Sequence, residues 1–190
     1  MTLTFARATI DPHTPHMSHM LDNMEALHAA IAAATSGSSR PLWHLDGDRI
    51  YVLADQLDED RLSARLCGAP IRTADYQRLL DRIQSGSRFV FDLHANPSKT
   101  VGHHRTPLLA PRQRLDWILR KISDGGGTIT EAYVTGSRTI TIRKPSTSTI
   151  LHMVDYTGQV SVTDPTRFRS MLLNGVGPGK AYGMGWLMLR

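Results

Sequence analysis

Apolar residues along the first half of the chain alternate between two spacings. A spacing of two is typical of a half-buried strand, and a spacing of three to four is typical of an amphipathic helix. These patterns predict the order strand, helix, strand, strand, helix, strand. The expected strands are residues 2–10, 41–45, 49–54 and 88–95, and the expected helices are residues 20–34 and 73–83. Asp46-Gly47-Asp48 joins two of these strands and is typical of a hairpin turn.

The second half of the chain shows a similar pattern. Residues 96–109 contain Pro97, Gly102 and Pro107, so we expect a basic linker or long loop there. Helices are expected at residues 111–122 and from Asp164-Pro165 to residue 174, and strands at residues 129–134, 138–143, 150–162 and 183–189. The two halves predict an α+β protein with two tandem ferredoxin-like domains, each an antiparallel sheet with helices on one face. The expected domains are residues 1–97 and 98–190.

Composition narrows the class of protein. The chain has 190 residues, of which 41% are hydrophobic and 21% charged, so it can bury a core. No apolar run approaches the roughly 18 residues of a membrane span, and the N-terminus lacks the pattern of a signal peptide. A single cysteine, Cys67, excludes an internal disulfide framework and a cysteine-based zinc site. We therefore expect a cytoplasmic protein with no membrane partner.

Charge is distributed unevenly along the chain. The formal net charge is +5, but acidic residues outnumber basic ones in residues 1–95 and basic residues dominate residues 96–190. Such asymmetry predicts that the second half faces a polyanion. A solvated basic surface without such a partner is the alternative.

A glycine-rich segment precedes the last expected strand. Residues 175–185 contain five glycines, with Lys180 among them. Backbone N–H groups in such a loop can approach an anion closely. The segment is not a nucleotide-binding P-loop, because Asn174 stands at the first glycine position and Ala181 follows the lysine. A plain connector is the other interpretation.

This loop resembles the glycine-rich signature of the repeat-associated RAMP proteins, and above all that of the CasE (Cse3) family. Four more segments are similar to that family in the same order. They are Glu25-Ala-Leu-His28, where the family has Tyr-x-x-His, then Pro41-Leu-Trp-His-Leu45, Arg88 to Thr100, and Arg114 to Lys121. Because the matches are collinear over nearly the whole chain, the sequence is identified as a member of this family of repeat-processing endoribonucleases of the subtype I-E Cascade.

The resemblance implies a metal-independent ribonuclease that binds the CRISPR repeat hairpin and cuts pre-crRNA at the 3′ base of the stem. The nucleophile would be the 2′-hydroxyl beside the scissile phosphate, giving a 2′,3′-cyclic phosphate and a 5′-hydroxyl. No cofactor is implied. The protein, a monomer when alone, would stay on the mature crRNA with other Cascade subunits. Two alternatives stay open: a RAMP protein that binds RNA without cutting it, and an unrelated ferredoxin-like enzyme that uses histidines with a metal.

His28 is the expected catalytic residue. From the residues alone, His28 is an ordinary helix histidine. The resemblance implies that it transfers protons, because it stands at the position of the family's catalytic histidine, and an imidazole can do so near neutral pH. Glu25 stands where the family has tyrosine, so a tyrosine-assisted mechanism lacks its phenol here. Either His28 works with a different partner, or Glu25 orients it or favours its charged form.

Candidate RNA-binding residues come from the basic half. Stem RNA is contacted mainly through phosphates and 2′-hydroxyls, which favours lysine, arginine and exposed backbone N–H groups. The candidates are Lys99, Arg105, Arg112, Arg114, Arg138, Arg143 and Lys144, with Gly177, Gly179 and Lys180 in the glycine-rich loop. For Arg138, a hairpin turn pointing at solvent is the alternative.

Three histidines, His13, His16 and His19, precede the first expected helix at intervals of three. Pro12 and Pro15 interrupt a continuous helix, and neither a cysteine nor a close carboxylate pair accompanies the histidines. We therefore expect a mobile loop here and no metal site.

Overall fold

The computed structural model describes residues 3–102, 104–144 and 147–190. The chain divides into two compact units. The first unit comprises residues 1–78, 141–149 and 181–183, and the second comprises residues 79–140, 150–180 and 184–190. Two short segments from the second half of the sequence therefore belong to the first unit. The expected domain boundary between residues 97 and 98 stays a prediction.

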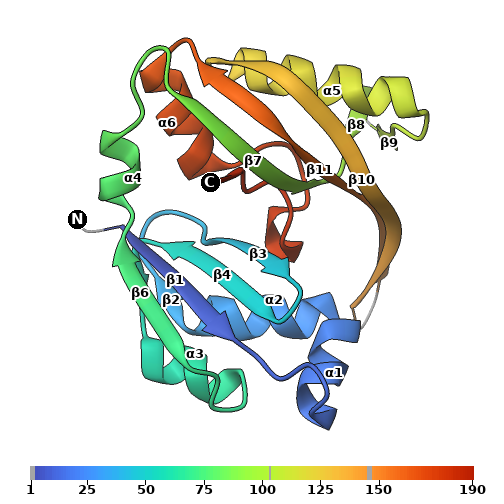
Figure 1. The fold of residues 1–190 in the computed structure, drawn as a ribbon. Helices are drawn as coiled ribbons and strands as arrows, with labels where there is room; N and C mark the ends of the chain where they lie inside the picture. Colours follow the sequence, from blue (N-terminus) through green and yellow to red (C-terminus); the bar gives the residue numbers. More distant parts are fainter. Residues whose placement is uncertain (1–2, 103, 145–146) are drawn as a thin grey trace. The chain divides into compact units, whose positions relative to one another are not determined.

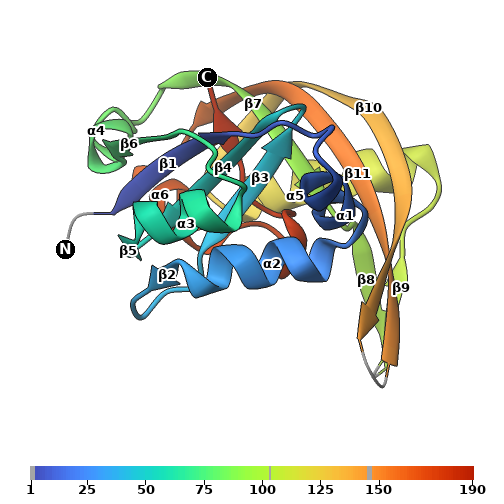
Figure 2. The same ribbon diagram turned by 90° about the horizontal axis from the view of Figure 1, so that it is seen from below.

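The first unit contains a four-stranded antiparallel sheet in the order β3-β4-β1-β6 (Figure 1). Its strands are β1 (Thr4–Thr9), β3 (Leu42–Asp46), β4 (Arg49–Ala54) and β6 (Ile71–Asp75). Helices α2 (Met24–Ala33) and α3 (Glu59–Arg65) cover one face of this sheet in both views (Figures 1 and 2). The predicted hairpin is confirmed, since Asp46 lies opposite Arg49. A second, two-stranded sheet pairs β2 (Thr35–Ser36) with β5 (Gln56–Leu57).

The helix expected at residues 73–83 is wrong, because residues 71–75 form strand β6 beside β1. Only the short helix α4 (Gln77–Asp81) follows. The helix that completes the unit is α3, where the Asp58 side chain caps the first turn by accepting from Arg61 N at 2.9 Å. The fourth strand is therefore β6, and residues 88–95 belong to the other unit.

The helix expected at residues 20–34 is two helices, α1 (Pro15–Asp22) and α2, which meet at Asn23. Thr14 caps α1, and Pro15 occupies the first turn, where a missing N–H breaks no intrahelical hydrogen bond. His16 and His19 therefore lie on a helix, and the mobile loop expected there is wrong. Among the described residues, no group of three His, Cys, Asp or Glu side chains is arranged to hold a metal ion.

The second unit contains a four-stranded sheet in the order β10-β11-β7-β12. Its elements are β7 (Arg88–Ala95), β10 (Gly127–Lys144), β11 (Thr147–Val162), β12 (Met188–Leu189), α5 (Pro111–Asp124) and α6 (Pro165–Asn174). The end of β10 from residue 141 and the start of β11 up to residue 149 belong to the first unit. Strands β11 and β12 pair antiparallel with β7. The strands predicted at residues 129–134 and 138–143 are one long strand, so Arg138 lies within β10 and not in a turn.

Helices α5 and α6 share an apolar core with this sheet. A side chain at Gly127 would collide with Ile122 of α5, Phe168 of α6 and Val160 of β11, so all three converge there. The predicted cap of α6 is confirmed, because Asp164 Oδ1 accepts hydrogen bonds from the backbone N–H groups of residues 166 and 167, each at 3.0 Å. The predicted α+β class with antiparallel sheets is confirmed in both units.

Residues 96–109 are not an irregular linker. They contain β8 (Ser98–Val101) and β9 (His104–Pro107), which pair antiparallel as a two-stranded ribbon. In the part of the chain that the structure describes, every helix is too short or too polar to cross a membrane.

Candidate functional site

Glu25 and His28 lie on the first two turns of α2. Residues three positions apart share a helix face, so their side chains are neighbours. The intervening Leu27 is fully buried in the core of the first unit, whereas Glu25 and His28 stay partly exposed. Asn23 caps the helix by accepting from Glu25 N at 3.2 Å. The local fold thus presents one carboxylate and one imidazole side by side at an accessible surface.

Tyr182 adds a phenol to these two side chains. Its hydroxyl donates to Glu25 Oε2 at 2.9 Å. Its ring lies 5.9 Å from the His28 ring, centroid to centroid, at 66° in an edge-to-face arrangement. We call Glu25, His28 and Tyr182 the α2 cluster. The sequence analysis did not identify Tyr182 as a site residue, although Tyr182 lies within the glycine-rich segment.

Trp43 of β3 holds the segment that carries Tyr182. Its indole Nε1–H donates to the Ala181 carbonyl at 3.1 Å, and only 1% of its surface is exposed. Gly183 has φ +71°, and a Cβ there would lie 2.7 Å from the Trp43 ring. A glycine is therefore required next to Tyr182, both for its backbone conformation and for the close approach of the indole.

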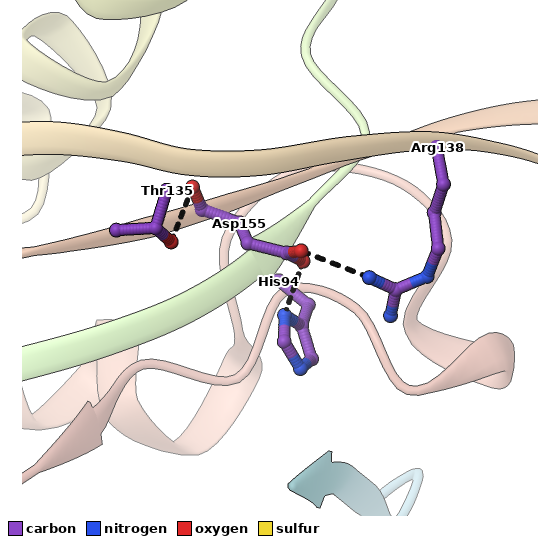
Figure 3. A network of polar contacts seen from close by, with 4 residues as sticks. All are labelled: His94, Thr135, Arg138 and Asp155. Carbon is purple, nitrogen blue, oxygen red and sulfur yellow. Dashed lines mark hydrogen bonds and ion pairs between the residues drawn. The ribbon is translucent and has the colours of Figure 1, made fainter. Parts of the chain in front are cut away.

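The second unit holds another histidine–carboxylate cluster, formed by His94 of β7, Asp155 of β11 and Arg138 of β10 (Figure 3). His94 and Asp155 are direct cross-strand partners, and Nδ1 lies 2.6 Å from Asp155 Oδ1. Arg138 Nη1 lies 2.8 Å from the other carboxylate oxygen, and Thr135 Oγ1 donates to the Asp155 carbonyl at 3.3 Å. We call His94, Asp155 and Arg138 the strand cluster.

Asp155 is charged in this cluster. Burial would raise the pKa of Asp155, but the hydrogen bond from His94 and the positive charges of His94 and Arg138 outweigh it and hold the pKa below its ordinary value. Arg138, an expected RNA contact, is thus anchored by a carboxylate on the neighbouring strand, which offsets part of its charge.

The other expected RNA contacts lie at several places in the fold. Lys99 and Arg105 are both exposed, but the register pairs Thr100 with Arg105, so the two cations point to opposite faces of the β8–β9 ribbon. Arg143 is exposed near the end of β10. Lys144 ends that strand, and its side chain lies outside the described residues.

Two arginines of α5 differ in their surroundings. Arg112 is exposed in the first turn. Arg114 is half-buried, and its Nε–H donates to the Leu108 carbonyl at 3.1 Å, while its own carbonyl accepts from the Tyr156 hydroxyl. Burial raises the pKa of Tyr156, although the charge of Arg114 opposes this, so the hydroxyl stays protonated and can donate. The exposed side chain of Arg112 can contact RNA, whereas the side chain of Arg114 also holds the segment before α5 through its hydrogen bond to Leu108.

The glycine-rich loop is shaped by packing. Gly177 has φ +71°, and a Cβ there would lie 2.7 Å from the Trp117 ring of α5. Gly179 has φ +93°, so a side chain there is strained too, although its Cβ would meet only the flexible side chain of Met184, at 2.9 Å. Lys180 is half-buried and opens the short 3-10 helix η1 (Lys180–Tyr182). A cavity of about 470 Å³ lies between α5, α6 and this loop, with Lys121, Arg167 and Gly177 in its lining.

Known proteins are similar to this chain over most of its length. A family model described as "CRISPR associated protein" matches residues 4–190. The CRISPR-associated endoribonuclease Cse3 of Thermus thermophilus is 27% identical over 184 residues, which cover 85% of this chain and 87% of the relative.

Two solved structures share the fold. The structure of Thermus thermophilus Cse3 bound to an RNA representing a pre-cleavage complex has a TM-score of 0.87 and 23% identity, and covers 100% of both chains. Cas6e from Escherichia coli str. K-12 has a TM-score of 0.70 and 19% identity, and covers 100% of this chain and 99% of that one. The tandem ferredoxin-like architecture and the resemblance described under the sequence are both confirmed.

Proposed function

Because the chain belongs to the family of CRISPR-associated proteins, we propose that it is an endoribonuclease that binds the repeat hairpin of pre-crRNA and cleaves it at the 3′ base of the stem. The observation that carries this proposal is the match, over 85% of this chain and 87% of the relative, to a protein named as a CRISPR-associated endoribonuclease. Exposed Arg112 and the cavity, whose lining includes Lys121, Arg167 and Asp124, support an anionic partner.

The proposed chemistry is an internal transesterification that needs no metal ion. The 2′-hydroxyl oxygen forms a bond to the scissile phosphorus as its proton is removed, and the bond from phosphorus to the 5′-oxygen breaks as that oxygen gains a proton. The products are a 2′,3′-cyclic phosphate and a 5′-hydroxyl. His28 transfers a proton in this reaction, since its imidazole lies partly exposed and can exchange protons near neutral pH. The basic residues stabilise the charge that develops on the phosphate.

The protein is also proposed to stay bound to the mature crRNA as a Cascade subunit. Retention requires that the hairpin, which lies on the 5′ side of the cut, keeps its contacts after cleavage. The contacts proposed for Lys99, Arg105, Arg112, Arg138 and Arg143 are to the stem, so they survive the loss of the downstream fragment.

The test uses the full chain and end-labelled repeat RNA from the same locus, under single-turnover conditions in excess EDTA. We expect one cut at the 3′ base of the stem and a product that ends in a 2′,3′-cyclic phosphate. Tight binding with intact RNA would instead identify a non-catalytic RNA-binding subunit. Cleavage that EDTA abolishes and Mg²⁺ restores would overturn the metal-independent mechanism.

A further inference from the structure

We propose that Tyr182 is a positioning residue of the cleavage reaction, which acts on His28 through the Glu25 carboxylate and through contact between the two rings. The inference rests on the proposed ribonuclease function. It adds to that function a residue of the glycine-rich loop and a defined role for Glu25.

Tyr182 contacts both other members of the α2 cluster. The hydroxyl donates to Glu25 Oε2 at 2.9 Å, and the ring meets the imidazole of His28 edge to face with centroids 5.9 Å apart. One rigid side chain with two rotatable bonds therefore fixes the position of the carboxylate relative to the imidazole. Edge-to-face packing is a favoured geometry for such rings, so it restricts how the imidazole can turn.

The Glu25 carboxylate needs a hydrogen-bond donor that holds it in one rotamer. Glu25 is partly exposed on a helix surface, and a glutamate side chain has several rotamers of similar energy. A hydrogen bond donated to an ionised group is among the stronger ones in proteins. The phenol thus selects the rotamer that keeps the Glu25 carboxylate on the helix face that it shares with His28. The proton of the phenol stays in this hydrogen bond and takes no part in the reaction.

Tyr182 is itself held in place. The residues on either side of it both contact Trp43, Ala181 through its carbonyl and Gly183 through the close approach of the indole ring. The indole is buried, with 1% of its surface exposed, so the phenol is presented on a backbone that packs against a fixed side chain. A preorganised group of this kind costs little entropy when the reaction begins.

The test compares Tyr182→Phe, Glu25→Ala and the double variant with the wild-type chain. Tyr182→Phe removes the hydroxyl and keeps the ring, so the fold and the contact with His28 survive. We expect the single-turnover cleavage rate to fall about tenfold, as for loss of one hydrogen bond to a charged group, while the dissociation constant of the hairpin changes less than about twofold. In the Glu25→Ala background, Tyr182→Phe should change the rate less than about twofold, because its acceptor is gone.

Tyr51→Phe is the matched control. It removes a phenol from the same unit, on β4, where the side chain interacts with Arg49. We expect the rate and the melting temperature of this variant to match wild type within error.

The outcomes separate the two proposals. If the wild-type protein cleaves and Tyr182→Phe cleaves equally fast, Tyr182 is no positioning residue, although the proposed function stands. If Tyr182→Phe slows cleavage tenfold in the wild-type background and tenfold again in the Glu25→Ala background, the role assigned to Glu25 is overturned. If the wild-type protein does not cleave the repeat hairpin at all, the proposed function fails, and this inference fails with it.

Discussion

The two units share one architecture and differ in the polar cluster that each carries. Each has a four-stranded antiparallel sheet, a histidine beside a carboxylate, and a tryptophan packed against a positive-φ glycine of the same loop. In the first unit Glu25 accepts from the hydroxyl of Tyr182, whose ring packs against His28. In the second unit Asp155 is held by His94 and by the guanidinium of Arg138.

The difference lies in what each carboxylate stabilises. The strand cluster links three strands and anchors a cation, so its interactions hold the sheet and aim Arg138. The α2 cluster lies at the end of a helix on a partly exposed face, where an imidazole can reach a ligand. A histidine–carboxylate pair therefore does not identify a reaction centre by itself. Its role depends on the other side chains that contact the pair.

The largest expected effects come from the two glycines against tryptophan. Gly177→Ala and Gly183→Ala each place a Cβ at φ +71° and 2.7 Å from an indole ring. Backbone strain and overpacking together should cost about 2–5 kcal/mol, seen as a lower melting temperature for both variants. Lys180→Ala, between them in sequence, should cost less than about 1 kcal/mol.

The two glycine variants should differ in function at a temperature where both are folded. Gly183→Ala shifts the segment that carries Tyr182, so we expect slower cleavage with nearly normal hairpin affinity. Gly177→Ala disturbs the packing of the loop on α5, so we expect weaker hairpin binding. Normal melting and normal RNA binding in both variants would mean that the loop is only a connector.

A smaller effect should distinguish the charges of the two units. Arg112 of α5 and Arg61 of α3 are both exposed in the first turn of their helices, where a carboxylate suits the helix dipole. Neither Arg112→Glu nor Arg61→Glu should therefore destabilise the fold. We expect Arg112→Glu to weaken hairpin binding about tenfold and to lower the salt dependence by about one counterion or more, and Arg61→Glu to change little. Equal losses would contradict the assignment of RNA binding to the basic second half of the chain.

The sequence predicted the elements whose signals are local. The hairpin around Gly47, helix α5 and the Asp164 cap of α6 all follow from neighbouring residues, and all are confirmed. The error at residues 73–83 arose because pairing of Thr73 with Ala6 across the sheet outweighed the helical spacing that follows.

Two features of the candidate sites could not be predicted. Tyr182 lies 157 positions from Glu25, and no local pattern joins a helix near the start of the chain to a loop near its end. The strand cluster depends on the register of three strands, which the spacing of apolar residues did not specify.

The smallest effect concerns the strand cluster and pH. The pKa of Asp155 is lower in the folded chain than in the unfolded one. Ionisation of Asp155 therefore stabilises the fold at pH values above the unfolded pKa of about 3.9. This stabilisation is lost as the pH falls through the folded pKa. Asp155→Asn should therefore reduce the free energy of unfolding at pH 7 by about 1–2 kcal/mol. The deficit should shrink as pH falls below about 4 in denaturant titrations. A deficit that is the same at pH 7 and pH 3 would show that the carboxylate charge does not contribute.

The most direct test of the account is the single-turnover cleavage rate of the repeat hairpin by His28→Ala compared with His94→Ala, each measured with saturating protein in EDTA. We predict that His28→Ala loses at least about 100-fold in rate, the range of a general acid or base, while its hairpin affinity stays within a few-fold of wild type. We predict that His94→Ala keeps its rate within about tenfold and loses stability instead, because it removes one partner of a paired carboxylate. A His28→Ala variant that cleaves at more than a tenth of the wild-type rate, or a His94→Ala variant that is folded and inactive, would contradict the assignment of catalysis to the α2 cluster.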